Sequence, residues 1–291
     1  MKKFILGFVV VLSGLNGFSS TWETSAAYRG SSKFYQVAAA IEKNLSLSFS
    51  TGLEARFTDE KVFKDPIYSV YVPLQLENEL LKAYVTPFYY FKNKSYQSGF
   101  QDASAWGVTG RLVMTLQEDS VEELYTHAYI GASFARQTGT LFLDGGTASN
   151  QSYNQLAYTL GVHKNFFHSF SFEVAGNAYH YPDGITGVQG FRGIMDQQDL
   201  APSQTFDFSH ELGKYNVGAR LTRIWMERQA SLYLGYRFAE FYSAEPEHSA
   251  VVGNTFSFTQ SIRADMGYNH VQSVHNRHKR DILYARLAWF F

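Results

Sequence analysis

The stretch Asp281-Ile-Leu-Tyr-Ala-Arg-Leu-Ala-Trp-Phe-Phe291 decides the fold class, because its side chains alternate strictly in character. In a β-strand, successive side chains point to opposite faces. One face is wholly apolar, and the other carries Arg286, the one charge in the strand interior. A strand of a soluble sandwich also alternates, but the final aromatic residues then have nothing beyond them to pack against. The interfacial aromatic girdle of a transmembrane β-barrel accommodates them. The apolar face consists of Leu283, Ala285, Leu287, Trp289 and Phe291.

This pattern resembles the last strand of Gram-negative outer-membrane β-barrel proteins, which commonly ends in Phe with a second aromatic residue two positions earlier. Phe291 and Trp289 match that assembly signal. Arg286 stands where the family often has a small residue. The resemblance extends to the class as a whole, and it implies insertion by the outer-membrane assembly machinery into a bilayer of lipid and lipopolysaccharide.

The amino terminus has the three regions of a secretory signal peptide. Lys2 and Lys3 precede an apolar run over residues 4–12, and Gly17 and Ser19 are small residues at the positions that a signal peptidase reads. We therefore expect a signal peptide at 1–19 and a single barrel domain at 20–291. The alternative, an anchoring helix, is disfavoured because the run is shorter than the roughly 20 residues that cross a bilayer. Without cysteine, neither a lipoprotein attachment site nor a disulfide framework is expected.

The composition fits an all-β membrane protein better than a helical one. Aromatic residues make up 17% of the chain, yet after the amino terminus there is no long apolar run. A barrel needs this balance, because only alternate residues of each strand meet lipid. The formal net charge of −1 gives no reason to expect a nucleic-acid partner.

Alternating segments separated by short and long connections predict an antiparallel up-and-down β-barrel of about twelve strands. The clearest segment is Leu45–Phe57, whose inner row includes Glu54 and Arg56 and which we expect to follow a turn at residues 42–44. Further short turns are expected at residues 163–165 and 226–228. Pro73 lies within the expected strand 67–77, so we predict a bulge or an early strand end there.

The strand number depends on the region before the last strand. Thr255–Tyr268 alternates and is either a protruding hairpin or a further crossing, which raises the number to fourteen. If the weakly patterned first pair of strands is not real, the number falls to ten. It must be even, because we expect both ends of the barrel chain on the periplasmic side, where the connections are short.

The residues expected to face the interior carry both signs of charge. A barrel of this size is wide enough for a narrow aqueous passage unless side chains or a loop fill it. Arginine binds carboxylate or phosphate in a two-pronged geometry, so an arginine-rich wall favours anionic solutes. The competing interpretation is that these arginines pair with the glutamates and close the barrel. The predicted pore-lining residues are Arg56, Arg111, Arg220, Arg237, Arg286, Glu54 and Glu173.

Catalysis is the weaker alternative. Some outer-membrane barrels of this size hydrolyse lipids with a serine and a histidine near the outer rim. His163, His168-Ser169 and His180 are candidates, but no nucleophile motif surrounds them and the first three lie near an expected periplasmic turn. We therefore predict that the protein is not an enzyme and needs no cofactor.

Two outer regions suggest surface contacts. His270, His275 and His278 lie in a basic run whose spacing matches no metal site, and we expect a solvated rim that touches lipopolysaccharide phosphates. The glycine-rich loop Pro182–Pro202 either displays an adhesive or receptor-like surface or folds inward as a constriction. Asp183, Asp196 and Asp199 in and near it do not have the spacing of a calcium-binding loop.

The sequence thus predicts a porin-like channel in the outer membrane that passes small hydrophilic, and preferentially anionic, solutes by diffusion. A plugged structural barrel, a surface-binding barrel and a lipid hydrolase are the alternatives. No metal and no nucleic acid are expected.

Overall fold

The computed structural model describes residues 22–61, 65–78, 80–93, 100–119, 124–142, 148–166, 169–185, 194–196, 206–208, 212–225, 229–275 and 278–291. Within these ranges no helix is long and apolar enough to span a membrane. The predicted signal peptide and the expected turn at residues 226–228 lie outside them. The strands are β1 (Trp22–Gly30), β2 (Phe34–Ser46), β3 (Phe49–Glu60), β4 (Ile67–Tyr71), β5 (Leu74–Glu77), β6 (Leu81–Asn93), β7 (Phe100–Asp119), β8 (Leu124–Phe142), β9 (Ala148–Phe166), β10 (Phe170–His180), β11 (Ile194–Asp196), β12 (Phe206–Phe208), β13 (Gly213–Trp225), β14 (Ala230–Phe241), β15 (Glu247–Thr259), β16 (Ile262–Ser273) and β17 (Lys279–Phe290).

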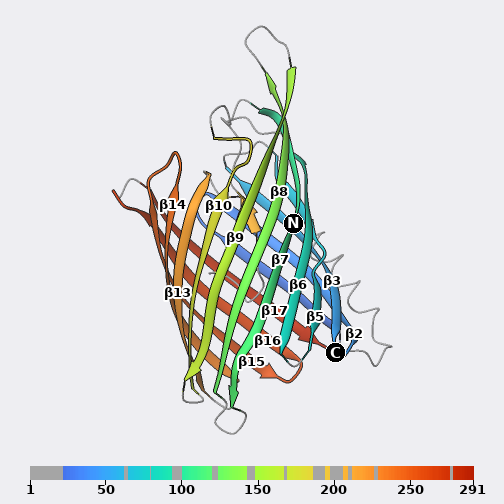
Figure 1. The fold of residues 1–291 in the computed structure, drawn as a ribbon, viewed down its shortest axis with the longest axis vertical. Coiled ribbons are helices and arrows are strands. Elements are labelled where there is room, and N and C mark those ends of the chain that lie inside the picture. The colour runs from blue at the N-terminus through green and yellow to red at the C-terminus, as the bar shows by residue number, and fades with distance from the viewer. Residues whose placement is uncertain are drawn as a thin grey trace.

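One antiparallel sheet closes on itself to form a barrel (Figure 1). Strand β1 pairs with β2 on one side and with β17 on the other. At the bottom of this seam, the Trp22 amide donates to the Phe291 carbonyl at 2.7 Å, and the Phe291 amide donates to the Trp22 carbonyl at 2.9 Å. Closure leaves no edge strand, which a lipid-exposed sheet requires.

The barrel has fourteen crossings rather than twelve. The sheet contains fifteen hydrogen-bonded segments, of which β4 and β5 are two halves of one interrupted crossing. The difference from the preferred number arises before the last strand, where β15 and β16 are both full-length and lie between β14 and β17. The alternative number of fourteen was therefore the right one.

Pro73 interrupts the fourth crossing without shifting its register. Tyr71 lies opposite Glu54 and Leu74 lies opposite Thr51, so the pairing with β3 continues in step across the gap. The Gly52 amide still donates to the Pro73 carbonyl at 2.9 Å. Pro73 cannot donate a backbone hydrogen bond in exchange, because proline lacks an N–H. The predicted early strand end is thus confirmed, whereas the register shift of a bulge does not occur.

The inner and outer faces follow the predicted alternation. In the last strand, Leu283 is 61% exposed on the outer face, while Tyr284 and Ala288 on the inner face are 6% and 2% exposed. In β3, Leu53 is 51% exposed and Arg56 only 3%. Large apolar side chains therefore cover the outside, as a lipid-facing surface requires.

Two predicted turns are wrong for the same reason. Residues 42–44 belong to β2, which continues to Ser46, so β3 begins at Phe49 rather than Leu45. Residues 163–165 likewise belong to β9, which continues to Phe166. At each true turn, the odd-numbered residues lie on the same face of the sheet in the strand before the turn and in the strand after it. The alternation of side chains therefore continues without a break and does not reveal the position of the turn.

Strands β7, β8 and β9 are longer than a membrane crossing requires, with 20, 19 and 19 residues. The paired ends of β8 and β9 project beyond the rim at the end of the barrel away from the carboxy terminus (Figure 1). The sequence predicts shorter strands here, at Trp106–Leu116, Leu124–Ala135 and Tyr153–His163, because the projecting parts, such as Gln137–Thr140, are polar. The long connections, including the one that contains the small β11–β12 sheet, lie at this same end.

Candidate functional site

The seven predicted pore-lining residues lie on the inner face of the barrel. Glu54, Arg56, Arg111 and Arg286 line cavities in the interior. Arg237 alternates in β14 with Leu234 and Tyr236, which are 54% and 51% exposed on the outside. Glu173 and Arg220 are direct partners across β10 and β13.

On one side of the interior, a chain of polar contacts links side chains of β7, β8, β10 and β13. The Arg220 guanidinium donates to the Glu173 carboxylate, with 2.6 Å between Nη2 and Oε2. The Tyr129 hydroxyl donates to the other oxygen of Glu173 at 2.7 Å. The Arg111 guanidinium lies 3.5 Å from the centre of the Tyr129 ring, a cation–π contact. Arginines from β7 and β13 are thus linked through a tyrosine and a carboxylate.

On the other side, two further arginines hold glutamates. Arg286 on β17 donates to Glu23 on β1 at 2.8 Å. Arg56 forms an ion pair with Glu54 on its own strand, and its guanidinium lies 4.0 Å from the centre of the Tyr71 ring. The Tyr71 and Tyr90 hydroxyls are 2.6 Å apart and hydrogen-bonded. Arg56, Arg220 and Arg286 are therefore all matched by carboxylates.

A cavity of about 420 Å³ lies between these walls, in the half of the barrel nearer the short turns. Its charged lining balances, with four carboxylates and four arginines. The predicted pore-lining set lacks Glu23, Glu42, Asp265 and Arg263, and the last two belong to the crossing β16, which the sequence pattern left undecided. The charged lining residues are Glu23, Glu42, Glu54, Asp265, Arg56, Arg111, Arg263 and Arg286.

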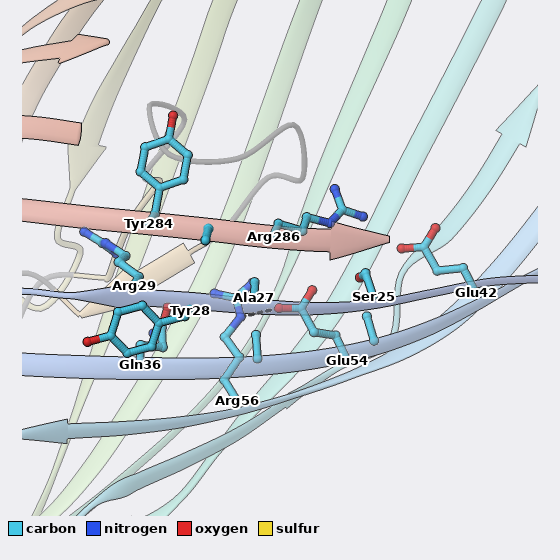
Figure 2. Close-up of a pocket in the computed structure, with 13 residues that line it drawn as sticks. Ser25, Ala27, Tyr28, Arg29, Gln36, Glu42, Glu54, Arg56, Tyr284 and Arg286 are labelled. Atoms are coloured by element: carbon cyan, nitrogen blue, oxygen red, sulfur yellow. Dashed lines mark hydrogen bonds and ion pairs between the residues drawn. The ribbon is translucent and has the colours of Figure 1, made fainter. Parts of the chain in front are cut away.

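A smaller recess of about 70 Å³ is cut into the wall beside this cavity (Figure 2). Ser25, Ala27, Ala38 and Ala40 form its small-residue floor, because alternate positions of the run Ala38-Ala39-Ala40 face inward. Tyr284 and Arg286 from β17 and Glu42 from β2 surround it, and the Glu54–Arg56 ion pair stands on one side (Figure 2). Recess and cavity share Glu42, Glu54, Arg56 and Arg286.

Ile194, in the loop strand β11, packs inside the barrel in the half farther from the short turns. Its side chain is 1% exposed and packs in a cluster with lumen residues such as Tyr71, Phe88 and Tyr90. The Gln155 side chain holds it, donating to the Ile194 carbonyl at 2.5 Å and accepting from the Ile194 amide at 2.9 Å. The inward-folding alternative for this loop is therefore correct for its described part.

The candidate catalytic residues do not assemble. His163 faces the interior, where it bonds Asn165 at 3.1 Å and stacks on Tyr125, and His180 is exposed at the end of β10. His168 lies outside the described residues, next to Ser169. Asp183 accepts a bond from the Asn154 amide at 2.8 Å, Asp199 lies outside the described part of the chain, and only the backbone of Asp196 lies inside it.

Three described side chains of the basic rim lie beside carboxylates. His270 Nδ1 is 2.7 Å from Asp281, and His275 Nδ1 is 3.5 Å from Glu245. Arg280 donates to both oxygens of Glu247 at 2.9 and 3.0 Å. In the described ranges, no three His, Cys, Asp or Glu side chains are grouped to hold a metal ion.

Trp289 and Phe291, the predicted assembly signal, lie at the lower end of the seam. Trp289 is on the outer face opposite Thr24, and Phe291 is 42% exposed. The position is that of an interfacial aromatic girdle, while the signalling role itself stays a prediction.

No family model and no curated protein matches the sequence. Among solved structures, the chain is similar to CdiB from Acinetobacter baumannii, with a TM-score of 0.54, 9% identity, and coverage of 94% of this chain but only 60% of CdiB. It is similar to the Pseudomonas putida toluene transporter TodX, with a TM-score of 0.50, 11% identity, and coverage of 93% of this chain and 89% of TodX. For the KdgM porin, the TM-score is 0.45 at 8% identity, covering 92% of this chain and 99% of KdgM. The fold is thus that of outer-membrane β-barrel proteins.

Proposed function

We propose that this protein is a porin-like channel of a Gram-negative outer membrane, through which small hydrophilic solutes diffuse. The observation that carries the proposal is the 420 Å³ cavity, which charged and hydrogen-bonding side chains of β1 to β7, β16 and β17 line on the inner face of the barrel. A barrel of fourteen crossings is wide enough to hold water unless its interior is filled. The apolar outer face supports insertion into lipid.

The charge pairing argues for weak ion selectivity. An anion-selective wall needs arginine charge in excess of carboxylate charge, but Arg56, Arg220 and Arg286 each hold a glutamate. Arg111 contacts the Tyr129 ring and lines the cavity. We therefore propose that any preference for anions is small.

The competing function is a closed barrel with a structural or surface-binding role. The closed barrel is favoured by the position of Ile194, which lies buried inside the barrel in the half farther from the short turns. In a closed barrel, the ion pairs serve only to stabilise the wall.

Single-channel recording in a planar bilayer distinguishes the two. We expect the refolded protein to produce stable open steps, and a potassium chloride gradient to give a reversal potential close to zero. A properly folded protein, recognised by its heat-dependent migration in electrophoresis, that stays silent contradicts the channel. Arg111→Ala should move the reversal potential toward cation preference, whereas the same change at Arg136 on the outer face should not.

A further inference from the structure

Three carboxylates on adjacent strands face the cavity. Glu23 on β1 and Glu42 on β2 are direct partners in the sheet, and Glu54 lies on β3. Like charges directly opposite each other destabilise a sheet. Arg286 compensates Glu23 and Arg56 compensates Glu54. With the residues that the structure describes, the Glu42 side chain makes no hydrogen bond or ion pair, so in this part of the wall three carboxylates face two arginines, each already paired.

A second acceptor in the same cavity also lacks a donor. Asp265 is 3% exposed, and its Oδ1 accepts from the Thr255 hydroxyl at 2.6 Å and lies 3.5 Å from Arg263. Its Oδ2 is buried without a partner in the described part of the barrel. Arg286 is the sheet partner of Asp265, but its guanidinium bonds Glu23 instead. A buried carboxylate oxygen without a donor is costly, and a ligand that brings one removes the cost.

We propose that the cavity is a binding site for linear diamines or polyamines, with one ammonium group at Asp265 and another at Glu42. A protonated amine brings three donors and a positive charge, and its bonds to carboxylates are of the strong, charge-assisted kind. The inference rests on the proposed channel, because the solute reaches the cavity through the lumen.

The spacing of the two acceptors sets the length of the ligand. Strands β17 and β1 lie between β16 and β2, so Asp265 and Glu42 are three interstrand distances apart across the sheet. The sheet row of Asp265 runs through Arg286 and Ala27 to Ala38, so Glu42 is also four residues further along its strand. The two positions are therefore about 20 Å apart along the wall. A single amine or a metal ion does not contact both. The Arg286–Glu23 pair lies between Asp265 and Glu42. The neutral methylene chain of a diamine passes over this ion pair without repulsion.

The test uses 1,12-diaminododecane as the probe and 1,3-diaminopropane as a ligand of equal charge that is too short to reach both carboxylates. Block of single-channel current should require about tenfold less of the longer diamine. Glu42→Gln and Asp265→Asn should each weaken that block about tenfold. Glu247→Gln is the matched control, because it removes one inner-face charge at the opposite end of the barrel and should leave the block unchanged.

Failure of the site and failure of the channel give different results. Open channels that both diamines block equally, or a block that survives Glu42→Gln, overturn the site and leave the channel intact. If the folded protein gives no channel current, titration calorimetry of the detergent-solubilised protein with the same diamines shows whether the binding site exists. Binding that Glu42→Gln abolishes then supports the site while the channel fails, and absence of binding overturns both. Glu42→Asp, which keeps the charge, replaces any variant that does not fold.

Discussion

Glu173 and Arg220 lie directly opposite each other on β10 and β13, and their side chains form an ion pair of 2.6 Å inside the barrel. Tyr129 completes the coordination of the carboxylate from β8. The arrangement fastens three strands to one another from the inside. It also means that an arginine on the inner face does not by itself create an anion-attracting wall, because the paired carboxylate offsets most of its charge at distances larger than their separation.

Removing Arg220 should therefore affect both stability and selectivity. We expect Arg220→Ala to lower the free energy of unfolding by about 1–2 kcal/mol, because the pair is partly exposed. It should also shift the reversal potential toward cations, since the Glu173 charge is then uncompensated. Urea unfolding of Arg220→Ala, Glu173→Gln and the double variant should give a coupling energy of about 1 kcal/mol. Additive single effects would show that the ion pair contributes nothing.

Releasing Ile194 should widen the passage. Gln155→Ala removes both hydrogen bonds that hold the Ile194 backbone inside the barrel, and Ile194→Ala reduces the apolar packing. We expect both variants to increase single-channel conductance, by about twofold if the constriction limits the current. Gln151→Ala, on the same face of β9 but near the strand end, serves as the control. Unchanged conductance in Gln155→Ala would place the limiting constriction elsewhere.

A glycine on the inner face makes room for the Tyr129 ring. A Cβ atom added at Gly161 would lie 2.5 Å from the ring carbon Cε2 of Tyr129. Gly161→Ala should therefore displace the ring and lower the free energy of unfolding by about 1–3 kcal/mol, measured by urea titration. Gly110→Ala is the control, because the nearest atom to its added Cβ is 3.8 Å away. Equal stability of the two variants would mean that the ring moves aside at no cost.

Phe291 contributes a backbone and a ring, and two variants separate them. Deletion of Phe291 removes the two hydrogen bonds to Trp22 together with the ring, whereas Phe291→Ala keeps the backbone bonds. If the aromatic ring is the assembly signal, both variants should reduce the folded, heat-modifiable fraction in the outer membrane. If seam closure matters more, only the deletion should do so. Normal amounts of both would contradict the carboxy-terminal prediction.

The alternation of side chains predicted the barrel, the facing of its strands and the inner position of every candidate pore residue. It did not locate the turns at Leu47-Ser48 and after Phe166, because the inner and outer parity continues through them. It also left β15 and β16 undecided, since a protruding hairpin and a pair of crossings have the same pattern over so short a stretch. Asp265 and Arg263 were lost with that decision.

Pairing inside the barrel depends on a quantity that a single strand does not contain. Arg286 bonds Glu23 rather than its direct partner Asp265, and Arg56 bonds Glu54 on its own strand. Which acid an arginine reaches is set by the relative displacement of neighbouring strands and by side-chain conformation. The position of Ile194 is likewise a long-range contact, made with strands far from it in the chain, and no local pattern indicates it.

The seam between β1 and β17 joins Glu23 to Phe290, almost the largest sequence separation the chain allows. Contacts of such high order form slowly, because the entropy of closing the loop is lost before the contact is gained. Until the last strand arrives, both edges of the sheet expose unpaired amides and carbonyls that attract other chains as readily as each other. The barrel is therefore most vulnerable to aggregation just before it is complete, and whatever shields these two edges in the cell controls the yield of folded protein.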